Sequence, residues 1–364
     1  MPVRKGRSSP LYMTHVVPGL EELAWEEVQE RAGGVLRVAT WSSIDRRAGV
    51  LLFRSSEPPE ELLDLRLTED CFAVVAFTTQ LPPGRRGLRD LIQLAAAGEQ
   101  METALRCHRE AVAPHVRGRP TFRVIVRKAG SHAFRRVDAQ RACETGLARR
   151  FPRWRLVEDD AVLEFWLQII GEDAILALRL SSAAMRQRTY RGANLPAALK
   201  PTVAHALVRL ARPRAGRLLI DPMCGTGTVL AEAAEAGIPV LGGDIELEAV
   251  RAARRNLQSL REYGRVAHWD TARLPLPDGI AGGLACNLPW GRGSNGGDLM
   301  DLYRRVLVEA SRVVERGGRI ALLTSQRELI ERLLRGRRGL TVERRISVVV
   351  RGVDAWLVAL RKSV

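Results

Sequence analysis

The sequence predicts an α/β protein whose carboxyl-terminal half forms a doubly wound, Rossmann-like sheet, with α+β domains before it. After Gly216, short apolar strands alternate with helical segments, which indicates a mostly parallel sheet covered by helices on both faces. Before residue 181 this alternation is missing, and two strands meet in a hairpin pattern around Gly171-Glu-Asp173. The 364 residues, 46% of them hydrophobic, are enough for two or three domains.

The amino-terminal part is predicted to hold two α+β units. Glu57-Pro-Pro59 breaks the chain after a β-α-β-β order, so the first unit covers residues 1–58 and the second covers 59–180. A polar, basic stretch over 181–195 is interpreted as a linker. The elements expected here are helices over 20–30, 88–109 and 138–151, and strands over 12–17, 35–38, 49–53, 121–127, 161–170 and 173–180.

The α/β domain is expected to cover residues 196–364. Its strands are short and apolar throughout, so we expect them to be buried between two helix layers. The last two strands follow each other directly and are expected to pair. The expected strands are 218–221, 240–244, 266–269, 283–287, 319–324, 347–350 and 355–360, and the expected helices are 201–211, 228–236, 247–260, 299–314 and 328–334.

Positive charge is concentrated in one block of the chain. The formal net charge is +16, and residues 103–155 alone hold 14 basic and 3 acidic side chains. Almost all of the basic residues are arginines, whose planar fork suits phosphate. The block therefore suggests a polyanionic partner, although a solvated surface would also explain it.

Other features narrow the class of protein. The five cysteines are isolated, with no CxxC pair, and no histidines have metal-ligand spacing, so we expect a reducing compartment and no metal site. No apolar run is long enough for a signal peptide or a membrane span. We therefore expect a cytoplasmic protein, and a monomer.

A glycine-rich turn follows the first strand of the α/β domain. Asp221 ends that strand, and Gly225 and Gly227 would let the backbone approach a ligand closely. The turn is not a P-loop, because no Gly-Lys-Ser/Thr follows it, and it lacks the third glycine of the dinucleotide fingerprint. Ligands of such sheets bind at this carboxyl edge.

Two more strand-end acids accompany the turn. Asp244 ends the next strand and could accept hydrogen bonds from ribose hydroxyls, and Asp270 ends a third and could accept one from an adenine amine. Each acid alone could equally be a helix cap. Three in consecutive βα units, with Asp221 in the glycine turn, favour a nucleoside-containing cofactor.

The tetrapeptide Asn287-Leu-Pro-Trp290 ends a further strand and predicts chemistry on an amine. An exocyclic nitrogen must become pyramidal as it attacks a methyl group, and acceptors for its two N–H bonds favour that change. The Asn287 side chain and the Leu288 backbone offer such carbonyls, and Pro289 biases Leu288 toward an extended conformation. Trp290 offers a face on which a base can stack.

These two segments, Asp221-Pro-Met-Cys-Gly-Thr-Gly227 and Asn287-Leu-Pro-Trp-Gly291, resemble the class I S-adenosylmethionine-dependent methyltransferases that modify amino nitrogens. The usual tetrapeptide of that family is Asn-Pro-Pro-Tyr, from which this chain departs at Leu288 and Trp290. The resemblance implies S-adenosylmethionine as cofactor. It implies catalytic roles for Asn287, Leu288, Pro289 and Trp290, and cofactor binding by Pro196, Asp221, Cys224, Gly225, Thr226, Gly227, Thr228, Asp244, Ile245, Asp270, Thr271 and Asn287.

The amino-terminal half resembles the THUMP RNA-binding domain with its ferredoxin-like partner. The resemblance rests on Pro18-Gly-Leu-Glu21, Thr121-Phe-Arg-Val124 and Gly130-Ser-His-Ala-Phe-Arg135. Arg188-Thr-Tyr-Arg191 and Leu195-Pro-Ala-Ala-Leu-Lys200 resemble the segment that joins THUMP to the catalytic domain, which implies that this segment helps to seat the methionine end of the cofactor. In this order the chain is most similar to the tRNA guanine-N2 methyltransferases that act at position 6 of the acceptor stem. The residues expected to bind tRNA phosphates are Arg123, Arg127, Lys128, Arg135, Arg136, Arg141 and Arg149.

Three alternatives stay open on the sequence. One is a 23S rRNA guanine-N2 methyltransferase of the same architecture. Another is a DNA adenine-N6 methyltransferase, against which the THUMP-like half and Leu288 argue. A third is an RNA-binding protein without catalysis, against which the intact Asp221, Asp244, Asp270 and Asn287 argue.

Overall fold

The computed structural model describes residues 9–44, 46–112, 119–182, 184–188, 190, 198–260, 264–291 and 296–363. The chain forms two compact units, one holding residues up to Met185 except for Val17–Leu20, and one holding that short segment and the chain from Arg186 onward. Within the described ranges, no helix has the length and the apolar character that crossing a bilayer requires.

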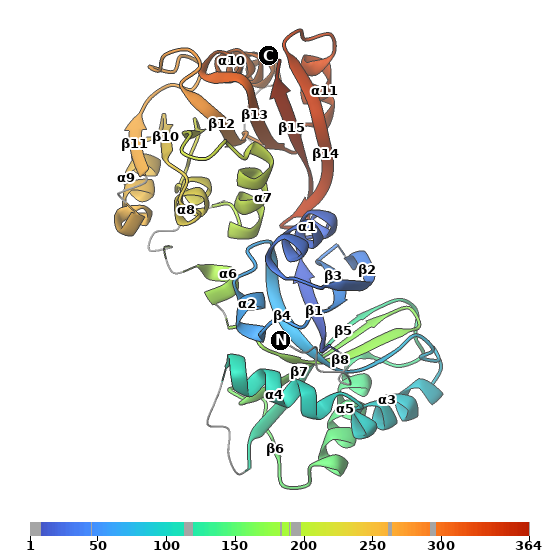
Figure 1. Cartoon of the computed structure of the whole chain (residues 1–364). Coiled ribbons are helices and arrows are strands. Elements are labelled where there is room, and N and C mark those ends of the chain that lie inside the picture. Colours follow the sequence, from blue (N-terminus) through green and yellow to red (C-terminus); the bar gives the residue numbers. More distant parts are fainter. Residues whose placement is uncertain are drawn as a thin grey trace. The chain divides into compact units, whose positions relative to one another are not determined.

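The amino-terminal unit is built on one eight-stranded sheet (Figure 1). Its strand order is β2-β3-β1-β4-β8-β7-β5-β6, antiparallel except where β5 pairs with β7 and β6. The elements are β1 Leu11–Val16, α1 Glu21–Arg31, β2 Leu36–Ile44, β3 Ala48–Arg54, α2 Pro59–Leu63, β4 Thr68–Thr78, α3 Arg86–Ala97, α4 Met101–Ala111, β5 Thr121–Ala129, α5 Arg136–Arg150, β6 Arg155–Leu156, β7 Leu163–Ile170, β8 Asp173–Arg179 and the short α6 Ala184–Gln187.

Strand β5 shows how the alternating pattern produces a two-faced strand. Phe122, Val124 and Val126 are at most 3% exposed and lie on one face, while Arg123 and Arg127 lie on the other. Because successive side chains of a strand point to opposite faces, this alternation was readable in the sequence. The apolar face of β5 packs against α5, which in turn packs on α3.

One expected element of this unit was wrong, and one central strand was missed. The single helix expected over 88–109 is two helices, because Gly98 adopts a left-handed backbone (φ 40°) and caps α3 through its N–H to Leu94 O. Strand β4 was missed altogether, although it lies in the middle of the sheet between β1 and β8. Its inner residues Cys71–Val75 are all buried, so they show no period of two by which a strand could be recognised.

The division predicted at residue 58 stays a prediction. Strands from both sides of it, β1 and β4, pair directly in the same sheet, with Met13 opposite Phe72. In the linker expected over 181–195, residues 183, 189 and 191–195 lie outside the described residues, and the described part contains the short helix α6.

The carboxyl-terminal unit confirms the doubly wound, Rossmann-like sheet. Its strand order is β11-β10-β9-β12-β13-β15-β14, with the first five strands parallel and the last two antiparallel to their neighbours. The elements are α7 Pro201–Ala211, β9 Leu219–Asp221, α8 Thr228–Glu235, β10 Val240–Asp244, α9 Leu247–Asn256, a 3-10 turn Gln258–Leu260, β11 Gly264–His268, β12 Ala281–Asn287, α10 Gly296–Val313, β13 Val314–Thr324, α11 Arg327–Leu334, β14 Leu340–Val350 and β15 Val353–Lys362.

Helices cover both faces of this sheet. Helices α7, α8 and α9 lie together on one face, and α10 and α11 pack on the other (Figure 1). The core on the α10 side includes Leu284, Tyr303, Ile320 and Leu322, each fully buried. Because β9 and β12 are central and parallel, their carboxyl ends open side by side at one edge of the sheet.

Candidate active site

Parallel pairing brings the predicted strand-end residues to one edge of the sheet. Asp221 ends β9, Asp244 ends β10 and Asn287 ends β12, and β9 lies between the other two strands. Asp221 and Asn287 line the same pocket. The other residues that line it are Ala198, Leu199, Met223, Cys224, Gly225, Thr226, Thr228 and Val229.

The glycine turn has the open backbone that its sequence predicted. Gly225 has φ +50°, and a Cβ placed there would meet nothing within 4 Å, so the space beside it is free for a ligand. Gly227 has φ +76° and begins α8, where a Cβ would press on Ala253 at 3.0 Å. Asn256 of α9 anchors the turn by donating to Thr226 O at 2.9 Å. The turn is thus held in place by α9 and leaves open space beside Gly225.

Asp221 is a buried carboxyl group that lines the pocket. Its side chain is 2% exposed and, among the described residues, accepts one hydrogen bond, from Met223 N–H at 3.2 Å. Burial raises the pKa of Asp221 to about 8, and the negative charge of Asp244 adds to this effect. The carboxyl group is therefore suited to ionise when a cationic group enters the pocket.

Asp244 and the next strand end extend the site. Asp244 accepts from Gly225 N–H at 2.9 Å and from Glu246 N–H at 3.1 Å, one bond on each carboxylate oxygen. Each oxygen keeps a lone pair for a further donor, as binding of ribose hydroxyls requires. Beyond β11, the Asp270 side chain caps the following turn at Ala272 N–H, at 2.8 Å. The neighbouring Thr271 hydroxyl is buried and has no hydrogen-bond partner among the described residues.

Not every residue expected to bind cofactor takes part in the same way. Cys224 is 6% exposed, and burial raises the pKa of its thiol well above the usual value, so it packs as a protonated thiol. Ile245 is 59% exposed. Pro196 lies outside the described residues. Ala198 and Leu199 also line the pocket, and they belong to the segment that the resemblance placed before the catalytic domain, although neither was named as a cofactor ligand.

The Asn287–Trp290 loop has a defined set of hydrogen-bond acceptors. The Trp290 indole N–H donates to Asn287 Oδ1 at 3.1 Å. Because an indole can only donate, this bond fixes which end of the amide is the oxygen and leaves that oxygen one lone pair. The Trp290 side chain therefore orients Asn287 besides presenting an aromatic face, a role the sequence did not suggest.

Of the backbone carbonyls of the three residues that follow Asn287, two already accept hydrogen bonds. Pro289 O accepts from the Tyr303 hydroxyl at 2.5 Å, and Trp290 O accepts from Gln326 Nε2 at 2.9 Å. No hydrogen bond to Leu288 O is found in the described part of the chain, while Leu288 N–H is held by Leu323 O at 2.9 Å. The loop thus leaves a spare lone pair on Asn287 Oδ1 and the carbonyl of the buried Leu288, which are the two acceptors predicted for an amine.

Similarity to known proteins identifies the class of enzyme. Residues 188–355 match the family model described as RMKL-like, methyltransferase domain (UPF0020). The tRNA (guanine(6)-N2)-methyltransferase of Thermus thermophilus is 29% identical over 322 residues, covering 87% of this chain and 90% of that protein. The crystal structure of TrmN from Thermus thermophilus matches with a TM-score of 0.79 at 26% identity, covering 97% of this chain and 99% of that one. The chain is a class I S-adenosylmethionine-dependent methyltransferase.

A further relative widens the comparison. The tRNA (guanine(10)-N2)-dimethyltransferase of Methanothermobacter thermautotrophicus is 30% identical over 211 residues, 55% of this chain and 59% of that protein. The site of the methyltransferase fits the cofactor on three counts: the open space beside Gly225 in the pocket, the spare lone pairs of Asp244, and the buried Thr271 hydroxyl, which has no partner among the described residues.

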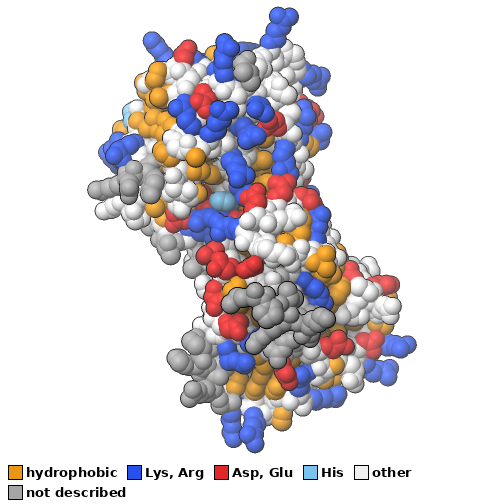
Figure 2. Space-filling model, in the orientation of Figure 1, with side chains coloured by type: hydrophobic (Ala, Val, Ile, Leu, Met, Phe, Trp, Pro, Cys, Tyr) orange, Lys and Arg blue, Asp and Glu red, His pale blue; other side chains and the backbone are white. Residues whose placement is uncertain are grey.

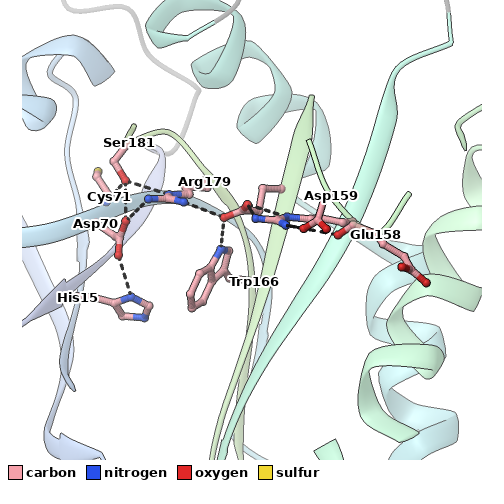
Figure 3. A network of polar contacts seen from close by, with 10 residues as sticks. His15, Asp70, Cys71, Glu158, Asp159, Trp166, Arg179 and Ser181 are labelled. Carbon is pink, nitrogen blue, oxygen red and sulfur yellow. Dashed lines mark hydrogen bonds and ion pairs between the residues drawn. The ribbon is translucent and has the colours of Figure 1, made fainter. Parts of the chain in front are cut away.

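The basic residues predicted to bind RNA differ in how far they are already engaged. Arg123 is bonded to Glu164 through Nε at 2.8 Å and Nη2, and is paired with Asp159 at 3.0 Å (Figure 3). Arg179 links the same Glu164, at 2.9 Å, to buried Asp70, at 2.6 Å. These pairs weigh against Arg123 as a phosphate ligand, and its assignment stays a prediction.

Helix α5 carries arginines that are better candidates for phosphate ligands. Arg136, Arg141 and Arg149 are exposed, and none forms a salt bridge within the described ranges. Arg135 caps its own helix by pairing with Asp138, and Arg127 lies 4.9 Å from the Trp166 ring centroid. Lys128 completes the predicted set and bonds to Gly130 O at 3.3 Å. On the face shown in Figure 2, basic side chains are interspersed with acidic ones.

Proposed function

We propose that the methyltransferase transfers a methyl group from S-adenosylmethionine to N2 of a guanosine in tRNA, at position 6 of the acceptor stem. The observation that carries this proposal is the pair of acceptors with a lone pair to spare, Asn287 Oδ1 and Leu288 O, on the loop whose Asn287 lines the cofactor pocket. The guanine-N2 activities named for relatives in two organisms support the choice of nitrogen, and the match along most of the Thermus protein supports tRNA position 6.

The residues of the loop would act on the acceptor amine. S-adenosylmethionine, when bound, supplies a methyl group on a good leaving group. Asn287 and Leu288 accept the two N–H bonds and favour a pyramidal nitrogen, and their dipoles then stabilise the positive charge that develops on it. Trp290 stacks on the base, an interaction worth roughly 1–3 kcal/mol. No strong base is required, since the extra proton leaves the nitrogen after methyl transfer.

The amino-terminal unit would hold the tRNA. We assign it a THUMP-like role in which exposed arginines of α5 bind phosphates without reading sequence. A guanosine paired in the acceptor stem must leave the helix to reach the loop, at a cost of a few kcal/mol. We also propose that the protein acts as a monomer in the cytoplasm. The five buried free cysteines would stay reduced there.

The test is a methylation assay with labelled S-adenosylmethionine and separate unmodified pools of tRNA, rRNA and DNA. Digestion and nucleoside analysis should give N2-methylguanosine from tRNA, and fragment mapping should place it at position 6. Label in rRNA or N6-methyladenine in DNA would contradict the substrate, whereas label at position 10 would contradict only the position.

The same assay tests the loop. Asn287→Ala should lower kcat by at least about 100-fold, the usual effect of removing one preorganised group that stabilises the transition state. Cofactor affinity, measured by calorimetry, should change little. Full turnover by Asn287→Ala would show that the amide is not the acceptor for the amine.

A further inference from the structure

A chain of hydrogen bonds with a defined direction ends on the Asn287–Trp290 loop. Tyr303 of α10 donates its single hydroxyl hydrogen to Pro289 O, at 2.5 Å. Thr324, at the end of β13, lies 2.7 Å from the same Tyr303 oxygen and must therefore be the donor to it. Thr324 in turn accepts from Gln326 N–H at 2.8 Å. Each hydroxyl donates once toward the loop.

A second hydrogen bond holds the next peptide of the loop. Gln326 Nε2 donates to Trp290 O at 2.9 Å, and Ser325 Oγ lies 3.4 Å from the same oxygen. Gln326 thus reaches the loop directly through its side chain and indirectly through Thr324. The two carbonyls that follow Leu288 are fixed from α10 and from the end of β13.

Burying these two hydroxyl groups costs folding free energy, so we expect them to have a function. Tyr303 and Thr324 are both fully buried, and Phe and Val of the same shape would satisfy the core without any polar atom. Burial raises the pKa of Tyr303 to about 12, which the bond from Thr324 partly offsets, so the hydroxyl stays a donor at any working pH. The polar pair serves the loop rather than the core.

We propose that Tyr303, Thr324 and Gln326 are positioning residues for methyl transfer. By occupying Pro289 O and Trp290 O, they hold the loop in the one conformation that keeps Asn287 Oδ1 and Leu288 O in place for the acceptor amine. This inference rests on the function proposed above, because it needs the loop to hold that amine.

The experiment compares wild-type protein with Tyr303→Phe, Thr324→Val and the double variant, using tRNA and labelled S-adenosylmethionine. Tyr303→Phe should lower kcat about 10- to 100-fold, the range a displacement near 1 Å can cause, and leave the cofactor KM within about twofold. Thr324→Val should lower kcat by less. The double variant should be no worse than Tyr303→Phe, because both act through one chain.

Three controls separate positioning from folding. Thr324→Ser keeps the hydroxyl and should restore kcat. Tyr12→Phe removes another fully buried tyrosine hydroxyl, which lies 3.5 Å from Cys107 Sγ in the amino-terminal unit, and should leave kcat unchanged. Asn287→Ala is run beside them.

The outcomes are distinct. Wild-type kcat in Tyr303→Phe, with Asn287→Ala inactive, would overturn the positioning role alone. A loss of kcat matched by an equal loss of cofactor binding, or of folded protein in thermal unfolding, would also overturn it. A wild-type protein that makes no N2-methylguanosine would overturn the proposed function as well.

Discussion

At the scale of single residues, the site is governed by burial of polar groups. Asp221 is nearly inaccessible and has one hydrogen bond, so water does not stabilise its charge and its pKa rises to about 8. An unfolded aspartate titrates near pH 4. Between these two values the folded protein holds a proton that the unfolded chain lacks, so its free energy of unfolding falls as pH rises from about 4 to about 8.

Asp221→Asn should remove this pH dependence. The variant should be more stable than the wild type at pH 8 and similar near pH 4, because an amide carries no charge to bury. Urea denaturation at several pH values measures the difference. Cofactor binding should weaken roughly tenfold, since the amide cannot form a charge-assisted hydrogen bond. Equal pH dependence of stability in the two proteins would contradict the ionisation of Asp221 in this range.

At the scale of elements, an ion network crosses one face of the amino-terminal sheet. Asp70 of β4, Arg179 of β8, Glu164 of β7 and Arg123 of β5 pair in sequence from strand to strand (Figure 3). Burial raises the pKa of Glu164, but bonds from Trp166, Arg123 and Arg179 more than offset it and hold the pKa below its usual value. The network therefore joins β4 and β5 to the β7–β8 hairpin, which lies far from β4 in the sequence.

Arg179→Met should destabilise the amino-terminal unit by about 3–5 kcal/mol, because it takes a cation from two carboxylates, one of them buried. Arg37→Met is the control, since its pair with Glu22 is exposed and worth at most about 1 kcal/mol. Urea unfolding monitored by circular dichroism measures the free energy of unfolding of both variants. A destabilisation below about 1 kcal/mol in Arg179→Met would show that the network contributes specificity rather than stability.

At the scale of the whole molecule, positive and negative side chains are distributed unevenly along the chain. Residues 1–99 hold 12 basic and 14 acidic side chains, while the block over 103–155 has a large positive excess. Arg141 and Arg149, two turns apart on α5, present that excess to solvent. An RNA bound there releases counterions from its phosphates, so binding weakens as salt rises.

The double variant Arg141→Gln/Arg149→Gln should bind tRNA more weakly and reduce the slope of log K against log salt by about 2, one for each phosphate that is no longer neutralised. Arg31→Gln/Arg37→Gln removes the same charge from a segment without net positive charge and should keep the slope. Filter binding between about 50 and 200 mM salt measures both. Equal slopes for the two double variants would mean that α5 does not bind the phosphates.

The sequence by itself determined the chemistry and the catalytic sheet. Gly225, Asp244 and Asn287 follow short apolar strands, and parallel strands bring their carboxyl ends together whatever the details of packing. Tertiary structure alone decided what surrounds them. Strand β4 was invisible because full burial erases the period of two, and Tyr303 gave no signal because its hydroxyl has a partner only once α10 packs over the loop. Local pattern records which face is buried; the partners of a buried polar group depend on distant segments.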